Sequence, residues 1–261
     1  MITKSYTKSE LTQQIREMGV NPDDLLTVHT ALKAVGNIET EGKSGAHILI
    51  EALKDAVPQG LLLIPSHTFK NIREEPVFNI RETMPCIGTV PSVAVTLANE
   101  AYDRGDKTCI RSFHVSHSVV AFGEKAIEFT EGDRKSESAM SEGGSYAKLY
   151  EQGGKILLIG IGIECNTFIH RAYEALEPQN IPEPYNITST DYDGSVVTRV
   201  ARNAPGGAKW YKNHLDWLEE HGGLVRGKIG DAPALLCDAR LCQQMVLELK
   251  EQVRKELALQ G

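Results

Sequence analysis

One short segment of the sequence places polar side chains at the end of an apolar run and then continues in small residues. Val28 is followed by His29 and Thr30, and small residues lead on to Gly36. Small residues let a ligand approach the backbone closely, and Lys33 in their midst is suited to contact a phosphate. The residues alone also allow a plain exit from a strand into a loop, with Lys33 in solvent.

A second segment, residues 110–118, carries two histidines, three serines and an arginine in nine positions. The Arg111 guanidinium presents a rigid fork of donors that suits phosphate or carboxylate recognition. The spacing of His114 and His117 also permits a metal site, because histidine is the commonest metal ligand. Neither a carboxylate pair nor a C-x-x-C pair nearby completes such a ligand set. An anion-binding loop, a structural loop and a metal site all stay open here.

A third segment contains Thr167, His170 and Glu174 at helical spacing. If the segment is helical, His170 and Glu174 are i,i+4 neighbours on one face. A carboxylate can orient an imidazole that acts as a general base, and the Thr167 hydroxyl can stabilise a developing oxyanion. The alternative is a helix capped by Thr167 with a surface His–Glu pair.

The residues just before this segment suggest two other chemistries, and both are weakly supported. Gly160 and Gly162 resemble the start of a dinucleotide fingerprint, but Cys165 stands where its third glycine would be. Cys165 could act as a nucleophile, yet it lies in an apolar stretch, and buried thiols are usually inert. We therefore expect neither a dinucleotide site nor nucleophilic catalysis.

These residues lie at the ends of predicted strands, where ligand sites of α/β sheets gather. Apolar runs predict buried strands at 25–30, 61–64 and 155–161, and further strands are expected at 109–112 and 119–122. Periodic apolar residues and capping patterns predict helices at 8–18, 45–57, 91–102, 123–130 and 145–152, from about 167, at 210–222 and at 238–259. The alternation predicts a layered α/β fold.

Residues 186–201 alternate in polarity around an Asp-Gly turn, which predicts an antiparallel hairpin. The hairpin either makes the main sheet mixed or adds a small second one. Residues 68–88 and 131–145 are polar and irregular, and we expect both to be exposed loops. We expect residues 227–233 to form a structural turn, and residues 1–261 to form a single domain.

The composition excludes several classes of protein. The chain has 28 basic and 35 acidic residues and a formal charge of −7, which disfavours a nucleic-acid-binding surface. It has neither an apolar run of about 20 residues, as a membrane span needs, nor a secretory signal. The cysteines are scattered and predict no disulfide framework (Cys86, Cys109, Cys165, Cys237 and Cys242). A cytoplasmic protein that binds neither nucleic acid nor a membrane is expected.

Six segments in this order and spacing resemble the aminoglycoside 3-N-acetyltransferase family, which transfers acetyl from acetyl-coenzyme A (acetyl-CoA) to an amine. They are VHTALKAVG (28–36), LLIPSHTF (62–69), IGTVP (87–91), IRSFHVSHSVVAFGEKA (110–126), GGSYAKLYEQGGKILLIGIGIECNTFIH (143–170) and VRGKIGDAPALL (225–236). The resemblance implies this family's own α/β/α sandwich with an antiparallel hairpin, and a small-molecule amine as acceptor. Residues 186–222 are then a candidate subdomain on the acceptor side.

The resemblance also implies a set of site residues. His170 matches the catalytic histidine of the family, Thr167 matches a threonine that stabilises the tetrahedral intermediate, and Glu174 is expected to hold the His170 ring. No metal is implied. The residues expected to line the acetyl-CoA site are His29, Thr30, Ala31, Lys33, Ala34, Val35, Gly36, Thr68, Arg111, Ser112, His114 and Ser118.

The sequence departs from the family pattern at two places. The family carries a glutamate three residues after the histidine, where this chain has Tyr173, and Glu174 comes one residue later. Residues 201–207 are uncharged apart from Arg202, whereas antibiotic-modifying members often carry acidic residues there. Another amine is therefore nearly as well supported as an aminoglycoside.

Two other functions stay open at this point, together with the oligomeric state, monomer or homodimer. One is a metal-dependent hydrolase that uses His29, His114, His117 and Glu174. The other is a non-catalytic protein that binds coenzyme A.

Overall fold

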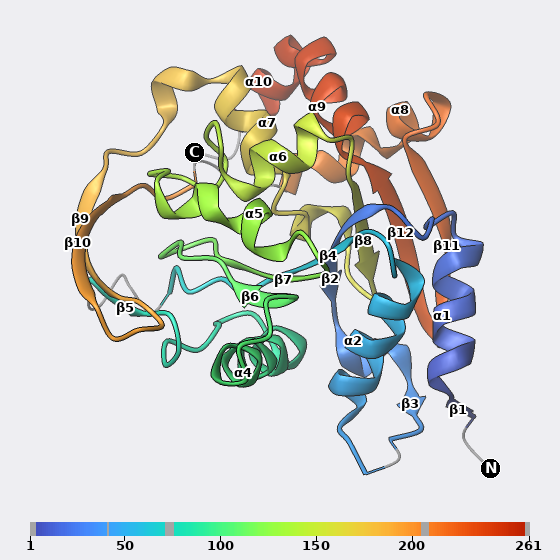
Figure 1. Cartoon of the computed structure of the whole chain (residues 1–261). Coiled ribbons are helices and arrows are strands. Elements are labelled where there is room, and N and C mark those ends of the chain that lie inside the picture. Colours follow the sequence, from blue (N-terminus) through green and yellow to red (C-terminus); the bar gives the residue numbers. More distant parts are fainter. Residues whose placement is uncertain (1–3, 41, 71–75, 205–208, 259–261) are drawn as a thin grey trace.

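The computed structural model describes residues 4–40, 42–70, 76–204 and 209–258. A seven-stranded sheet, with strand order β11-β12-β8-β2-β4-β7-β6, carries helices on both faces (Figure 1). Its strands are β2 (Leu25–Thr30), β4 (Leu61–Pro65), β6 (Cys109–Arg111), β7 (Val119–Phe122), β8 (Lys155–Ile159), β11 (Leu224–Ile229) and β12 (Ala232–Asp238). The predicted α/β/α sandwich is confirmed.

The sheet is mixed, and its parallel part lies at the centre. Strand β2 runs parallel to β4 on one side and to β8 on the other, whereas the pairs β4–β7, β6–β7, β8–β12 and β11–β12 are antiparallel. The C-terminal ends of β8, β2 and β4 therefore meet at one edge of the sheet. The chain leaves β2 toward a helix on one face and β8 toward a helix on the other, which opens a crevice between them.

The first face is covered by α1 (Lys8–Glu17), α2 (Gly45–Ala56) and α4 (Thr89–Asp103). Helix α1 begins with the capping box predicted from the sequence: the Glu10 N–H donates to the Thr7 hydroxyl, and the Thr7 N–H donates to the Glu10 carboxylate. Apolar side chains of α1 and α2, among them Ile15 and Leu49, are fully buried in one core with strands of the sheet.

The second face is covered by the helices of the C-terminal half together with α5. They are α5 (Ala126–Thr130), α6 (Ser145–Glu151), α7 (Ile169–Leu176), α8 (Leu215–Glu220), α9 (Ala239–Glu248) and α10 (Lys250–Ala258). The predicted single helix over 238–259 is wrong, because Leu249 ends α9 and a separate helix, α10, follows. Leu259 lies outside the described residues. Trp210, Tyr211 and Phe168 are fully buried in this second core.

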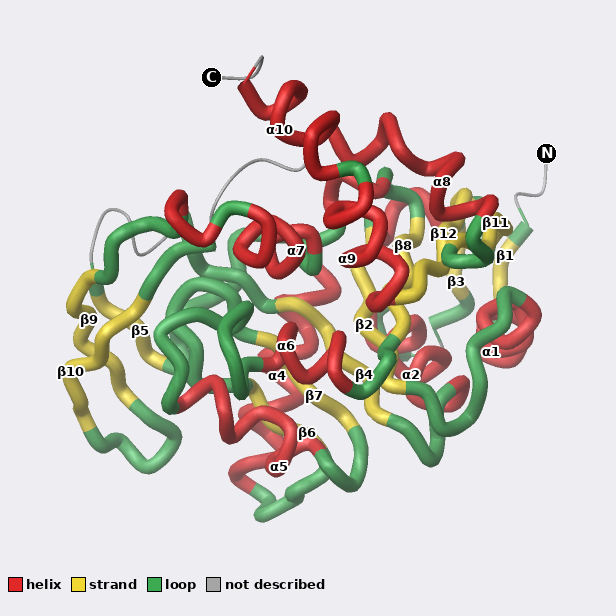
Figure 2. The backbone as a smooth tube through the Cα atoms, turned by 90° about the horizontal axis from the view of Figure 1, so that it is seen from above, coloured by secondary structure: helices red, strands yellow, loops and turns green. Residues whose placement is uncertain are grey.

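A small second sheet, β10-β9-β5, stands at one side of the molecule (Figure 2). The predicted hairpin is confirmed as β9 (Tyr185–Thr190) and β10 (Val196–Ala201), paired antiparallel. Its third strand, β5 (Val77–Asn79), falls inside residues 68–88, for which no strand was expected. The strand forms because Phe78 is buried against Phe113 and the hairpin. Residues 71–75 of that loop are outside the described part.

The predicted exposed loop at residues 131–145 is wrong as well. Asp133, Ser138, Ala139 and Met140 in it are buried. Asp133 accepts hydrogen bonds from the N–H and the hydroxyl of Ser145, each at 2.6 Å, at the start of α6. Asp133 and Ser138 are therefore paired inside the protein, while the charged residues of this loop that lie in water are Glu131, Arg134, Lys135, Glu137 and Glu142.

The remaining elements are short. They are the strands β1 (Ser5–Tyr6) and β3 (Asn37–Ile38), paired parallel, and the 3₁₀ turns η1 (Leu32–Val35), η2 (Glu131–Arg134), η3 (Ile163–Cys165), η4 (Pro178–Asn180) and η5 (Lys209–His214). The structural turn expected at 227–233 is the β11–β12 hairpin turn, where Gly230 has φ +61°. None of the helices in the described part of the chain is long and apolar enough to span a membrane.

Candidate active site

A cavity of about 350 Å³ lies at the edge of the sheet where β8, β2 and β4 end. Each of these strands supplies its wall, either directly or through the segment that follows it. Apolar and polar side chains share the lining, which consists of Val28, His29, Thr30, Ile64, Pro65, His67, Phe69, Ile87, Pro91, His117, Ile161, Cys165, Thr167 and His170. The predicted gathering of site residues at the strand ends is therefore present.

The end of β2 brings two buried polar atoms without partners to this cavity. The His29 side chain is 8% exposed, and neither its Nε2 nor the Thr30 Oγ1 finds a hydrogen-bond partner among the described residues. Burial lowers the pKa of His29 to about 4, so the ring is neutral at physiological pH. Because buried polar atoms are normally paired, this wall is suited to a ligand that supplies the missing hydrogen bonds.

The segment after β8 brings Thr167 and His170 to the same cavity. The His170 N–H donates to the Thr167 carbonyl at 3.1 Å, and α7 begins one residue before His170. Thr167 does not cap the helix, since Phe168 is the residue that precedes its first turn. His170 and Glu174 both lie in α7 as predicted, one turn apart.

Two further histidines that the sequence did not assign to the cofactor site complete a cluster around His170. The ring centroids of His67 and His117 are 4.8 Å apart, and those of His117 and His170 are 5.9 Å apart. Burial, together with the neighbouring imidazoles, lowers the pKa of both His67 and His117 well below the usual value. His67 could have been found from the sequence, because it lies just after the end of β4, a strand-end position comparable to that of Thr30 in β2.

The His67 ring is held by a hydrogen bond with a side chain of α6. Its Nε2 lies 3.0 Å from the Tyr146 hydroxyl, and both side chains are buried. The ring nitrogen and the phenol oxygen are therefore hydrogen-bond partners of each other. This contact fixes the His67 ring at the wall of the cavity.

Glu174 is buried on the side of α7 that faces the 131–145 loop. Its side chain is 7% exposed, and its Oε1 accepts a hydrogen bond from the Ser138 hydroxyl at 3.1 Å. Burial raises the pKa of Glu174, while the Ser138 hydrogen bond and the positive charges of Arg171 and Arg202 oppose that rise.

Arg111, expected to line the cofactor site, lies in the protein interior and is 1% exposed. It donates to the carbonyl oxygens of Ile80 at 2.9 Å, Thr83 at 2.8 Å and Ser66 at 3.2 Å. Desolvation lowers its pKa to about 10. These bonds tie three segments together behind the cavity.

The other predicted residues of this region also serve the backbone. The Ser118 hydroxyl donates to the Ser66 carbonyl at 2.8 Å, Ser112 accepts from the Val119 N–H at 3.0 Å, and the Thr68 hydroxyl donates to the Val115 carbonyl.

His114 holds its own loop. Its Nδ1 accepts the N–H groups of Ser116 at 3.3 Å and His117 at 3.0 Å, so its proton is on Nε2, which faces the Glu137 carbonyl at 3.3 Å. Neither His114 nor Thr68, Arg111, Ser112 or Ser118 is among the residues that line the cavity. Their role toward a cofactor stays a prediction.

The segment from Ala31 to Gly36, which includes Ala34 and Val35, leaves the cavity as the turn η1. Lys33 is exposed at its surface. Gly36 has φ +86°, and a Cβ there would lie 2.3 Å from a carboxylate oxygen of Asp231. The Asp231 N–H donates to the Val35 carbonyl at 2.9 Å, and its carboxylate accepts the Tyr6 hydroxyl at 2.6 Å. The turn is thereby fastened by two distant parts of the chain.

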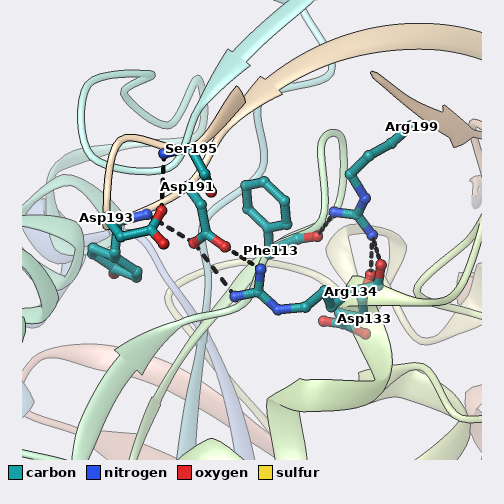
Figure 3. A network of polar contacts seen from close by, with 8 residues as sticks. Phe113, Asp133, Arg134, Asp191, Asp193, Ser195 and Arg199 are labelled. Atoms are coloured by element: carbon teal, nitrogen blue, oxygen red, sulfur yellow. Dashed lines mark hydrogen bonds and ion pairs between the residues drawn. The ribbon is translucent and has the colours of Figure 1, made fainter. Parts of the chain in front are cut away.

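The hairpin sheet is attached beside the histidines by a network of charged side chains (Figure 3). The Phe113 ring lies between the guanidinium groups of Arg134 and Arg199, at 4.8 and 4.6 Å from its centroid. Arg199 donates to the carbonyl of Asp133 at 2.9 Å and also to that of Phe113, while Arg134 pairs with the Asp191 carboxylate. The hairpin, the 110–118 segment and the 131–145 loop are joined here.

Two observations concern the other chemistries that the sequence left to consider, and the first corrects an expectation. Cys165 was expected to be buried, yet it is exposed at the cavity in the turn η3, which projects from the strand that precedes it. No group of three or more His, Cys, Asp or Glu side chains within the described ranges is placed to hold a metal ion. His29, His114, His117 and Glu174 thus do not form the ligand set of the alternative hydrolase.

Comparisons with known proteins agree with this architecture. The family model described as aminoglycoside 3-N-acetyltransferase matches residues 27–250. Aminoglycoside N(3)-acetyltransferase III of Serratia marcescens is 31% identical over 194 residues, which cover 70% of this chain and 68% of that protein.

Two solved structures share the fold. One is a mutant of aminoglycoside acetyltransferase AAC(3)-IVa in complex with a gentamicin, with a TM-score of 0.75 at 25% identity, covering 96% of this chain and 91% of that one. The other is AAC-IIIb in a binary complex with coenzyme A, with a TM-score of 0.74 at 22% identity, covering 95% and 97%. With a family model matched over most of its length, the chain belongs to the aminoglycoside 3-N-acetyltransferase family of enzymes.

Proposed function

We propose that the protein transfers the acetyl group of acetyl-CoA to a primary amine of an aminoglycoside or a similar amine, with His170 as the general base. The observation that carries the proposal is the cavity at the ends of β8, β2 and β4. It brings His170 and Thr167 into one cavity with the unpaired polar atoms of His29 and Thr30.

His170 has the proton-transfer role. An acceptor amine arrives mostly as ammonium, which is not nucleophilic, and His170 removes its proton. Glu174, one helical turn away, holds the imidazole and favours the imidazolium that forms. The amine then forms a bond to the thioester carbonyl carbon, and the carbon–sulfur bond breaks to release a thiol. Thr167 donates a hydrogen bond to the oxygen on which negative charge develops, an effect typically worth about 3 kcal/mol.

The cavity suits the reacting end of acetyl-CoA, which supplies the activated acetyl group. Its volume is at the lower end of the roughly 300–1,000 Å³ range of ligand pockets, and its walls combine apolar side chains with the unpaired atoms of His29 and Thr30. The rest of the molecule would extend along residues 31–36, where the exposed Lys33 faces solvent and is suited to a phosphate. The coenzyme A complex of AAC-IIIb supports this choice of donor for the shared fold.

The acceptor is proposed to enter from the side of the hairpin sheet. Residues 185–201 are joined to the histidine segment through Arg199 and Phe113, so an amine held there is directed toward His170. The gentamicin complex of AAC(3)-IVa supports an aminoglycoside. No carboxylate is among the described residues that line the cavity, which favours an acceptor with few positive charges near the reacting amine. Residues 205–207 of the segment 201–207 lie outside the described residues.

The test is thiol release from acetyl-CoA, followed with a chromogenic disulfide, over a panel of aminoglycosides and small amines. Release that depends on an aminoglycoside identifies a resistance-type activity. Release with another amine alone retains the chemistry and changes the substrate class. If no amine on a broad panel causes release while coenzyme A still raises the melting temperature, the non-catalytic alternative replaces this proposal.

A further inference from the structure

The 131–145 loop brings one hydroxyl group to the carboxylate on α7. Ser138 is 2% exposed and Glu174 is 7% exposed. The Ser138 Oγ lies 3.1 Å from Glu174 Oε1 and also accepts the Met140 N–H at 3.1 Å. Because the hydroxyl carries only one proton and its oxygen already accepts a hydrogen bond, that proton points at Glu174. A carboxylate accepts this hydrogen bond more strongly than a neutral carboxyl group does, so the contact favours the ionised form.

Two arginines place positive charge near the Glu174 carboxylate. Arg171 lies on the same helix and Arg202 follows β10, and both favour the ionised carboxylate. Arg202 is shared, however, because it also pairs with the Glu137 carboxylate at 2.8 Å.

The remaining neighbours contribute little opposing charge. His170 lies one turn earlier on α7, and Glu177 at the end of that helix pairs with Arg254. The buried side of α9, which packs on α7, is uncharged (Ala239, Cys242, Gln243, Met245 and Val246). Within the described residues, Ser138 is therefore the hydroxyl donor committed to the Glu174 carboxylate.

We propose that Ser138 is a positioning residue that holds the Glu174 carboxylate and favours its ionised form, so that this carboxylate can support His170 as the base. The inference rests on the proposed function, because it acts through His170. It also explains how a carboxylate shifted by one residue, with Tyr173 in the usual place, can serve the reaction. The loop supplies a matching donor on that side of the helix.

The experiment measures kcat against pH for Ser138→Ala with the best acceptor amine. A hydrogen bond to a charged group typically changes a pKa by about one unit. Loss of the hydroxyl should therefore move the acidic limb of the profile upward by about one pH unit, with KM for acetyl-CoA unchanged. Ser138→Cys keeps the shape with a weaker donor and should give a smaller shift in the same direction. Ser136→Ala, in the same loop, is the matched control and should leave the profile unchanged.

A double mutant separates this role from a merely structural one. In a Glu174→Gln background, Ser138→Ala should cause no further shift, because the carboxylate through which Ser138 acts is gone while His170 is retained. The inference is overturned if Ser138→Ala leaves the acidic limb in place, or if its effect is the same with and without Glu174. Melting temperatures of all variants identify any loss of fold, in which case the Ser138→Cys profile decides. If His170→Ala keeps full turnover, the proposed function itself fails, and this result is separate from the Ser138 outcome.

Discussion

The cavity wall and the hairpin sheet are built in different ways. The wall stands at the ends of three parallel strands whose position is set by backbone pairing across a seven-stranded sheet. Burial lowers the pKa of its His29, His67 and His117 rings and favours their neutral form. The hairpin sheet has three strands and is attached through guanidinium groups that bond carbonyl oxygens and a carboxylate. From this difference we propose that the main fold fixes the chemistry, while the separately attached hairpin sheet governs acceptor binding.

The largest effect should follow from removing the proposed general base in the cavity wall. His170→Ala should lower kcat by about a hundredfold or more, because proton transfer from the ammonium is lost. The affinity for coenzyme A, measured by calorimetry, should stay within about twofold. His221→Ala, which replaces an exposed histidine at the end of α8, is the control. Unchanged turnover would remove His170 from the mechanism.

The neutral wall also predicts how stability depends on pH. His29 has a pKa of about 4 in the folded protein and 6.5 as its ordinary value, so the unfolded chain binds more protons between these values. Stability is then complete above about pH 6.5 and falls as the pH drops toward 4. At about 1.4 kcal/mol per pKa unit, His29 alone accounts for about 2 kcal/mol between pH 7 and pH 5. Urea unfolding at both pH values measures this change.

The matched comparison is between two histidine variants. His29→Gln should reduce the pH dependence, with the remainder coming from His67 and His117, whereas the exposed His221→Gln should leave it unchanged. Equal slopes in the wild type and in His29→Gln would contradict the assignment of this titration to the cavity wall.

The attachment of the hairpin should affect the acceptor more than the chemistry. Arg199→Ala leaves buried carbonyls without donors and removes one side of the Phe113 stack. We expect KM for the amine to rise about tenfold, an energy of about 1.4 kcal/mol, with a smaller change in KM for acetyl-CoA. Hydrogen exchange should become faster in residues 185–201 and stay slow in β8. An equal loss of protection in both would show that the two regions are not separable.

The smallest effect should come from the surface of η1. Lys33→Ala removes an exposed charge suited to a phosphate, so KM for acetyl-CoA should rise about threefold, as expected for a solvent-exposed ionic contact. Turnover at saturation should not change, and added salt should reduce the difference between variant and wild type. Lys125→Ala, at the other edge of the sheet, serves as the control.

Local patterns predicted the parts of the site that depend on neighbours in sequence. The helical spacing of His170 and Glu174 placed both in one helix, and the apolar runs placed His29 at a strand end. Arg111 was expected to face a ligand, but its acceptors Ile80 and Thr83 are about thirty residues away in sequence, and no local pattern reveals them.

The same limit explains the misjudged loops. The polar composition of 131–145 suggested an exposed loop, yet Asp133 and Ser138 find partners on α6 and α7 that only the folded chain supplies. Strand β5 is only three residues long and depends on β9, more than a hundred residues later. Whether a polar residue is buried depends on the residue that pairs with it in the folded protein. Patterns in a single sequence do not identify that partner.

The contact between Tyr6 and Asp231 has a practical consequence for shortening the gene. It joins residues 225 positions apart, and Asp231 in turn holds the turn that ends at Gly36. A truncation that ends before Ser5 leaves the Tyr6–Asp231 hydrogen bond intact. A truncation that removes Tyr6 also removes strand β1, which pairs with β3. Removal of Tyr6 would thus loosen the turn that ends at Gly36, so Tyr6 marks how far the N-terminal segment can be shortened without affecting that turn.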